Sequence, residues 1–299
     1  IILVTGPTGS GKTTTLYGSL SELNKPQSKI ITVEDPVEYR LPRINQVQVN
    51  HKIDLTFSQV LRTTLRQDPD IIMVGEMRDK ETVEIGLRGA LTGHLVLSTL
   101  HTNDSISSAI RLLDMGAPGY LVASSLRAII AQRLVRRICD NCVVDEEVSS
   151  EAYFWLKTLN EDISDITFKK GKGCQKCNHS GYRGRVGVFE LLEMTEAMMT
   201  ALKNNDTSAF SEAARVSPEY KPLAHSALLY AKEGITSIDE VLKLVEMVGD
   251  AQDQEHTEHT VEDDVPELLV PQPERGPSTL KDSLGSDFSG SGLSLEDDN

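Results

Sequence analysis

The chain opens with a glycine-rich loop placed directly after a short apolar run. Residues 6–13 read Gly-Pro-Thr-Gly-Ser-Gly-Lys-Thr, and they follow Ile-Ile-Leu-Val at residues 1–4. A buried strand followed by a glycine loop that opens a helix lets backbone N–H groups surround a polyphosphate. Because the strand, the Lys-Thr pair and a helical continuation are all present, we interpret the loop as a phosphate-binding loop rather than a chance glycine turn.

The residue types of this loop suit a bound nucleoside triphosphate. Glycines let the backbone turn tightly and approach phosphates without a Cβ in the way. Lys12 supplies a point charge for the β- and γ-phosphates, and the Thr13 hydroxyl is the expected Mg²⁺ ligand. The predicted ATP-binding residues are Gly6, Pro7, Thr8, Gly9, Ser10, Gly11, Lys12, Thr13 and Thr14.

The net charge of the 299-residue chain, −15, is concentrated at its C-terminal end. Residues 250–299 hold fourteen acidic residues against Arg275 and Lys281, so they carry −12 and residues 1–249 carry −3. The body therefore neither demands nor excludes an anionic partner. The sequence contains no apolar run of membrane-spanning length, and we expect a cytoplasmic protein. A start at Ile1, on a strand that is normally internal to a sheet, predicts that an upstream region is missing.

The order of apolar runs predicts an α/β fold. Runs rich in Ile and Val recur at 29–33, 70–75 and 94–99 and alternate with helical patterns, as in a parallel sheet covered on both faces. This favours a RecA-like, doubly wound P-loop ATPase core with a zinc-stapled insertion and a C-terminal helical region. Helices are predicted near 57–67, 79–91, 104–115 and 118–136.

The rest of the chain divides by composition. From Cys139 to Cys177 the pattern is loop-like with one helix near 151–159, a strand is predicted at 186–192, and helical patterns run to about 248. The last helix begins with Ser-Ile-Asp-Glu at 237–240, which fits a capping box. The predicted regions are an ATPase core at 1–136, a tetracysteine module at 137–185, helices at 186–249 and an acidic disordered tail at 250–299.

An acidic residue ends one of the apolar strands. Glu76 follows Ile-Ile-Met-Val-Gly at 71–75, and in P-loop enzymes the carboxyl edge of the sheet is where the nucleotide lies. Glu76 is thus placed to orient or deprotonate the attacking water. Gly75 stands where most such proteins carry a magnesium-binding Asp. A solvated acid at a strand end is the alternative, and the phosphate-binding loop in the same chain favours the catalytic interpretation.

Two further polar clusters are predicted at the same edge. Glu34, Asp35 and Glu38 follow the 29–33 strand and could hold magnesium waters or polarise the nucleophile, although some could simply cap a turn. His94 and His101 bracket the 94–99 run. Their imidazoles could sense the γ-phosphate or signal its presence to a neighbouring subunit, whereas isolated histidines are more often structural.

Two arginines are spaced one helical turn apart. Arg62 and Arg66 would share a helix face and could present guanidinium groups to a γ-phosphate. A solvated helix surface is the equally weighted alternative.

Four cysteines form two C-x-x-C pairs separated by thirty-one residues. Four thiolates can close a tetrahedral zinc site, and a redox pair would need only one C-x-x-C. The predicted zinc ligands are Cys139, Cys142, Cys174 and Cys177, with His179 as a less favoured substitute.

Together, the phosphate-binding loop, the acidic residues 34–38, the Gly-Glu strand end at 75–76 and the two-histidine segment resemble the secretion ATPases of type II secretion and type IV pilus assembly. The sequences of residues 39–49 and 113–120 are most similar to those of a family member that acts in pilus assembly. The resemblance implies a homo-hexamer at the cytoplasmic face of the inner membrane, bound to a platform protein. It further implies that ATP hydrolysis with Mg²⁺ drives pilin polymerisation, with Glu76 as base and Arg62 and Arg66 as γ-phosphate contacts.

The resemblance also strengthens the zinc assignment, since many members carry such a tetracysteine insertion. It implies an N-terminal domain whose arginines complete the active site, and cyclic di-GMP binding only through a region upstream of this chain. The fragment could therefore bind nucleotide yet hydrolyse it weakly. A type II secretion ATPase is the nearest alternative, because it shares every motif.

Alternatives of another class remain. A basic segment around the cysteines would fit a nucleic-acid translocase. The only aromatic residues directly next to the basic ones in the sequence are Phe168 and Tyr182, so no stacking platform is predicted and no nucleic acid is expected. A nucleotide-binding scaffold without turnover is opposed by the intact Lys12 and Glu76. The basic residues are Arg133, Arg136, Arg137, Lys169, Lys170, Lys172, Lys176, Arg183 and Arg185.

Overall fold

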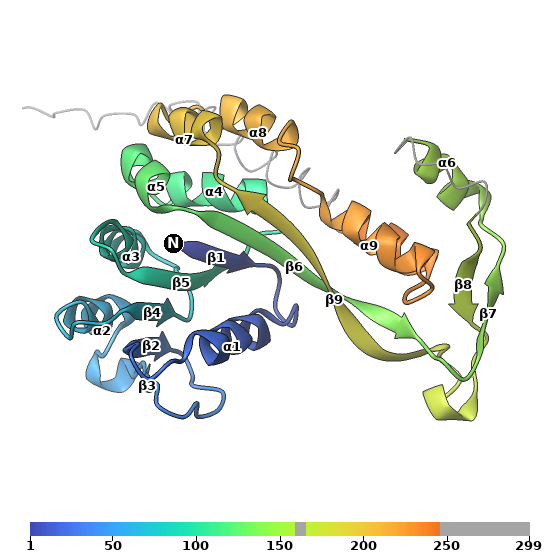
Figure 1. The fold of residues 1–299 in the computed structure, drawn as a ribbon, viewed down its shortest axis with the longest axis horizontal. Coiled ribbons are helices and arrows are strands. Elements are labelled where there is room, and N and C mark those ends of the chain that lie inside the picture. Colours follow the sequence, from blue (N-terminus) through green and yellow to red (C-terminus); the bar gives the residue numbers. More distant parts are fainter. Residues whose placement is uncertain (159–165, 246–299) are drawn as a thin grey trace, which may run out of the picture. The chain divides into compact units, whose positions relative to one another are not determined.

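A seven-stranded mixed sheet forms the centre of the protein in the computed structural model, which describes residues 1–158 and 166–245 (Figure 1). The strand order is β3-β2-β4-β5-β1-β6-β9, with β9 antiparallel to β6 and the other pairings parallel. The strands are β1 (Ile2–Thr5), β2 (Ile30–Glu34), β3 (Asn45–Gln48), β4 (Ile71–Val74), β5 (Leu95–Leu100), β6 (Ala128–Ile138) and β9 (Tyr182–Glu193). The four apolar runs predicted as strands at 1–4, 29–33, 70–75 and 94–99 are confirmed.

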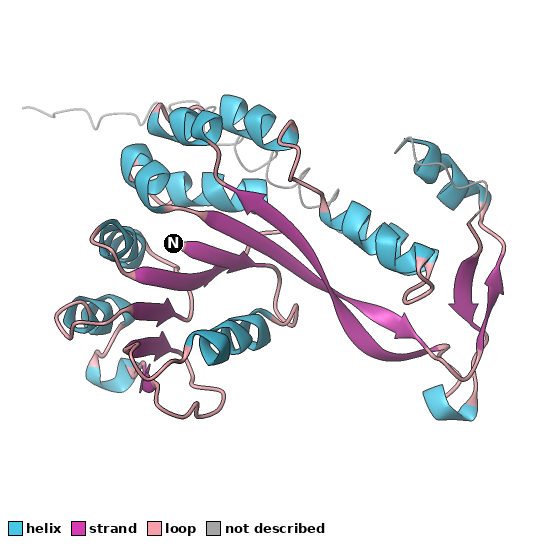
Figure 2. Cartoon of the chain, in the orientation of Figure 1, coloured by secondary structure: helices cyan, strands magenta, loops and turns pink. Residues whose placement is uncertain are grey.

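Helices cover both faces of this sheet (Figure 2), because its central strands bury side chains in both directions. Leu3 of β1 and Ile72 of β4 pack on the side of α3 and α5, whereas Val4 and Met73 pack against α1. The helices are α1 (Lys12–Leu23), α2 (Phe57–Thr64), α3 (Lys80–Leu91), α4 (Ser105–Asp114), α5 (Gly119–Ser125), α6 (Ser150–Thr158), α7 (Glu196–Lys203), α8 (Thr207–Arg215) and α9 (Leu223–Lys232), with short turns η1 (His51–Ile53) and η2 (Gln175–Cys177).

The prediction of one helix over 118–136 is wrong in its second half. Helix α5 ends at Ser125, and β6 begins at Ala128, between β1 and β9. The segment is rich in Ala, Gln, Arg and Leu, which favour helices locally, but its backbone hydrogen bonds are taken by two neighbouring strands. Tertiary pairing therefore overrides local propensity here.

The segment between the cysteine pairs is more regular than its loop-like pattern predicted. Strands β7 (Val143–Glu146) and β8 (Phe168–Gly171) form an antiparallel ribbon, and the predicted helix near 151–159 is α6. Val143 pairs with Gly171, so the ribbon brings the ends that carry Cys142 and Cys174 together. Pairing of distant segments, which local patterns do not reveal, closes the thirty-one-residue gap.

The C-terminal helices pack in two places: α9 lies against the sheet, whereas α7 and α8 pack on α5 and α4. The predicted strand at 186–192 is the end of β9, and α9 contacts both β9 and β6. A helical segment covers 238–245, as predicted, but the Glu240 carboxylate accepts from the Arg136 backbone N–H at 3.0 Å rather than completing a capping box. The acidic tail lies outside the described residues. The predicted region boundaries at 136 and 185 stay predictions. Strand β6 crosses the first boundary, and β9 crosses the second.

None of the helices in the described part of the chain combines the length and the apolar character that a bilayer span requires.

Candidate functional site

The phosphate-binding loop joins β1 to α1 and has no room for side chains at two glycines. Gly6 has φ +146°, and a Cβ there would lie 2.4 Å from the Gln132 carbonyl oxygen. Gly11 precedes α1 with φ +91°, in the left-handed region that favours glycine. Lys12 is buried and folds back on the loop, where its Nζ donates to the Gly6 oxygen at 2.7 Å and the Pro7 oxygen at 3.1 Å.

Glu76 lies at the same edge of the sheet as this loop. It follows β4, which is separated from β1 only by β5, and all three strands are parallel. The Glu76 side chain is 12% exposed and pairs with Arg78 and with His101, whose Nε2 lies 3.2 Å from Oε2. A cleft of about 370 Å³ opens beside these three side chains.

Lys12 and Glu76 interact electrostatically. Burial lowers the pKa of the Lys12 ammonium, the negative charge of Glu76 opposes this shift, and the positive charge of Arg133 adds to it. Glu76, Arg78 and His101 form one cluster of contacting side chains, at the same edge of the sheet as the loop that carries Lys12. The arrangement can hold an anion at the loop with a carboxylate nearby.

Glu34 is the buried member of the acidic group. Its carboxylate accepts from the hydroxyls of Tyr17 and Thr32 and from Gln46 Nε2 at 3.1 Å, and it is 3% exposed. Burial and the neighbouring Glu34 raise the pKa of the Tyr17 phenol. With these three donors in place, Glu34 ties α1 to β2 and β3 and has little capacity left for a metal ion.

Removing the Tyr17 hydroxyl tests this role. We expect Tyr17→Phe to lower the free energy of unfolding by about 1–3 kcal/mol, because the buried Glu34 carboxylate loses a donor. Urea titration followed by circular dichroism measures this. Tyr120→Phe, which removes the hydroxyl of an exposed side chain on α5, is the matched control and should be neutral. An equal change in both variants would contradict the assignment.

The other predicted edge residues are only partly brought together. Asp35 and Glu38 follow β2 and are exposed, with Asp35 Oδ2 3.2 Å from His51 Nε2. His101 follows the carboxyl end of β5 and reaches Glu76. His94 precedes β5, at the opposite edge of the sheet, where its Nδ1 lies 2.8 Å from the Gly89 oxygen. Within one chain, the structure therefore joins His101 to the cluster and separates His94 from it.

The two predicted arginines do not share a helix. Helix α2 ends at Thr64, so Arg66 lies in the turn that follows, where the predicted helix to 67 has already stopped. Arg62 pairs with Glu81 of α3 on the surface. The Arg62–Glu81 pair and the position of Arg66 before β4 leave both guanidinium groups away from the phosphate-binding loop of the same chain.

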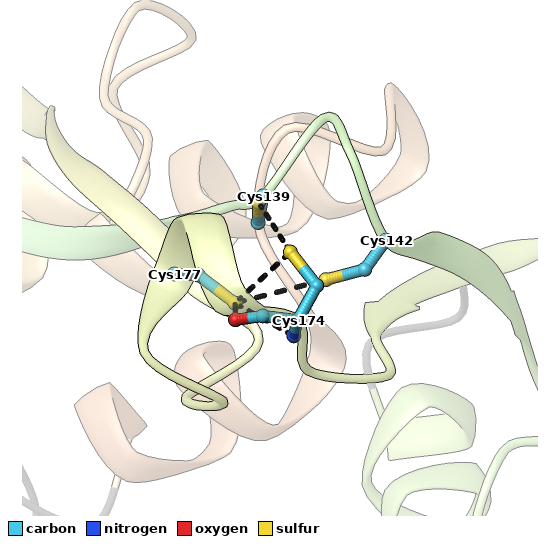
Figure 3. Close-up of side chains that lie close together, drawn as sticks. All are labelled: Cys139, Cys142, Cys174 and Cys177. Atoms are coloured by element: carbon cyan, nitrogen blue, oxygen red, sulfur yellow. Dashed lines mark hydrogen bonds between the residues drawn. The ribbon is translucent and has the colours of Figure 1, made fainter.

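The four cysteines converge in space (Figure 3). All four Sγ atoms lie within 4.8 Å of one another, and the shortest separations are 3.7 Å for Cys174–Cys177, 3.8 Å for Cys142–Cys177 and 3.9 Å for Cys139–Cys174. Zn–S bonds of about 2.3 Å in a tetrahedron require sulfur separations of about 3.8 Å. The donor set and its spacing therefore fit one zinc ion, and His179 is not among the grouped ligands.

Comparison with known proteins gives the family. The profile described as "Type II/IV secretion system protein" matches residues 1–243. The chain is 46% identical over 245 residues to type II secretion system protein E of Aeromonas hydrophila, covering 82% of this chain and 48% of that protein. It is 46% identical over 243 residues to the type IV pilus assembly ATPase PilB of Myxococcus xanthus, covering 81% and 43%. The chain belongs to the type II/IV secretion ATPase family.

The chain spans about half the length of the curated family members it matches, and corresponds to their C-terminal part. Among solved structures, the pilus retraction motor PilT with bound ADP matches with a TM-score of 0.59 and 30% identity, over 81% of this chain and 60% of PilT. The ATPase DotB of Legionella pneumophila matches with a TM-score of 0.59 and 25% identity, over 82% and 59%. The α/β P-loop fold with a four-cysteine insertion and C-terminal helices is thus confirmed.

The loop of this secretion-family chain fits a polyphosphate. The Ser10 hydroxyl is buried without a hydrogen-bond partner, and the glycine positions leave the backbone free of Cβ atoms. Thr13 and Thr14 are exposed at the start of α1. Backbone N–H groups at a helix start, a neighbouring ammonium and an unpaired hydroxyl are the donors that phosphate oxygens require.

Sequence reasoning missed two residues beside the loop, Gln132 and Arg133. Both are buried on β6, and Arg133 NH2 donates to the oxygen and Oδ1 of Asn103 at 3.0 Å. The prediction that Arg133 belongs to a basic surface around the cysteines is wrong, because Arg133 is buried. Because a helix was predicted over 118–136, the position of these two residues could not be predicted. Only the pairing of β6 with β1 brings them beneath the loop.

Proposed function

We propose that the chain is the ATP-hydrolysing part of a motor that drives type IV pilus assembly. One observation carries this proposal: Glu76 lies beside a cleft at the carboxyl edge of the sheet, the edge at which the phosphate-binding loop leaves β1. A carboxylate on this edge is suited to orient or deprotonate a water molecule that attacks the γ-phosphate. Membership of the secretion ATPase family supports the same chemistry.

The residues have distinct roles in this proposal. Lys12 would turn from the loop carbonyls to the phosphate oxygens of ATP, and Thr13 would hold Mg²⁺, which would supply positive charge beside the phosphates. Glu76 acts as the base. Its partners Arg78 and His101 fix the direction of the carboxylate.

The assembly and the partners are proposed from the family. We propose a homo-hexamer at the cytoplasmic face of the inner membrane, bound to a platform protein, in which neighbouring subunits complete each site. Arg62, Arg66 and His94, which lie away from the loop of their own chain, fit contacts of that kind. Asp35 and Glu38 are exposed near the carboxyl edge of the sheet and are proposed to help hold the magnesium waters. Cyclic di-GMP would bind only through a region upstream of this chain.

The pilus proposed is of the MSHA type. Residues 39–49 and 113–120 resemble MshE, the assembly ATPase of the mannose-sensitive haemagglutinin pilus. The second candidate is a type II secretion ATPase that drives pseudopilus assembly, and 46% identity to protein E of Aeromonas hydrophila favours it equally. Deleting the gene separates the two: loss of surface pili with intact enzyme secretion supports the first, and the reverse supports the second.

The loop lysine gives the direct biochemical test. We expect Lys12→Ala to abolish ATP turnover, because the main positive charge at the phosphates is lost. Phosphate release by the purified protein measures this, with and without DNA or membrane platform protein. Lys25→Ala, an exposed lysine after α1, is the control and should retain activity. Stimulation by DNA alone would favour a translocase, and ATP binding without any turnover would favour a scaffold.

We propose that the four cysteines hold a structural zinc ion. Metal analysis of freshly purified protein should find about one zinc per chain, as four thiolates close a tetrahedral site. A value near zero would contradict this.

A further inference from the structure

One buried amide side chain spans the phosphate-binding loop. Gln132 lies on β6, immediately beside β1, and is 3% exposed. Its Nε2 donates to the Ser10 carbonyl oxygen at 2.8 Å, and its Oε1 accepts from the Thr15 hydroxyl at 2.7 Å. Lys12 and Thr13 lie between these two anchor points in the chain. The amide therefore holds the loop on both sides of the residues that are proposed to bind phosphate and Mg²⁺.

Two glycines of the loop approach Gln132 so closely that a side chain at either position would clash with it. A Cβ at Gly11 would lie 2.8 Å from Gln132 Nε2, and a Cβ at Gly6 would lie 2.4 Å from the Gln132 carbonyl oxygen. Both distances are shorter than real Cβ contacts allow. The loop therefore packs closely against both the backbone and the side chain of Gln132.

The next residue extends the connection to the Glu76 side of the site. Arg133 NH1 donates to the Gln132 carbonyl oxygen at 3.3 Å, and NH2 donates to Asn103, two residues beyond His101. Burial lowers the pKa of this guanidinium, while Asp104 and Glu190 raise it. Strand β6 thus links the loop to the segment that follows β5, which carries the histidine paired with Glu76.

We propose that Gln132 is a positioning residue for nucleotide binding, a role that rests on the proposed function. It does not itself need to touch the nucleotide. Its two hydrogen bonds hold Ser10 and Thr15 so that the N–H groups between them point to one phosphate site. Preorganised donors bind an anion more tightly because less conformational entropy is lost on binding.

Two substitutions of similar size test this role. Gln132→Met keeps the volume and removes both hydrogen bonds, and we expect the affinity for MgADP to fall by about tenfold or more. Gln132→Glu keeps an acceptor for Thr15 but places a carboxylate against the Ser10 oxygen and near the phosphates, so the loss should be larger. Isothermal titration with MgADP measures affinity, and thermal unfolding without nucleotide measures stability.

A matched control separates positioning from a general loss of stability. Ser125→Ala removes a buried hydrogen bond, from Ser125 Oγ to the Leu87 oxygen at 2.9 Å, at the end of α5. It should lower the unfolding temperature and leave MgADP affinity unchanged. If Gln132→Met binds MgADP as tightly as the unsubstituted protein, the inference is overturned and the proposed function stands. If the unsubstituted protein binds no MgADP, the proposed function itself fails.

Discussion

Replacing Glu76 by Gln is expected to lower the rate of ATP hydrolysis by about a hundredfold or more. General bases contribute about 10²–10⁴ to a rate, and the amide cannot accept the proton. Gln keeps the shape of the side chain and can still contact Arg78 and His101, so MgATP affinity should change little. Phosphate release under saturating ATP measures turnover, and titration with MgATP measures binding.

The control for this variant is a carboxylate outside the cluster. Glu84→Gln makes the same chemical change on α3, where Glu84 pairs with Arg88 at 3.8 Å. Because such surface ion pairs contribute only about 0–1 kcal/mol, this variant should hydrolyse ATP as fast as the unsubstituted protein. Unchanged turnover in Glu76→Gln, or an equal loss in both variants, would refute the assignment of Glu76 as the base.

Replacing Cys174 by Ser is expected to remove the zinc and destabilise the module around it. Cys174 Sγ lies within 3.9 Å of Cys139 Sγ and 3.7 Å of Cys177 Sγ, so its loss opens the tetrahedron. Structural zinc contributes directly to folding free energy. With about 2–4 °C per kcal/mol for a chain of this size, loss of a few kcal/mol lowers the unfolding temperature by roughly 10 °C. Metal analysis and calorimetry measure the two effects.

His179 supplies the matched control for the cysteine variant. It is exposed, lies two residues after Cys177 and is not among the grouped ligands. His179→Ala should therefore retain about one zinc per chain and the original unfolding temperature. Zinc retained by Cys174→Ser but lost from His179→Ala would show that the ligand set is different.

The sequence alone determined the parts of this protein that depend on short patterns. The loop at residues 6–13 needs its glycines and lysine in one order, so the pattern specifies β1, the turn and the start of α1. Glu76 could be placed at the edge of the sheet because it follows four buried apolar residues with only Gly75 between them. The C-x-x-C pairs likewise predict a cluster, because few other arrangements use four cysteines in this way.

Tertiary structure decided which distant residues meet. β6 is a strand only because β1 and β9 take its hydrogen bonds, and this pairing brings Gln132 and Arg133 beneath the loop. Because β5 pairs in parallel with β1 and β4, His101 lies at the carboxyl edge of the sheet and His94 lies at the opposite edge. The Glu34 carboxylate accepts a hydrogen bond from Tyr17 because α1 packs beside β2 and places the phenol next to it. Each outcome depends on contacts between residues far apart in the chain, whose free energy no local pattern encodes.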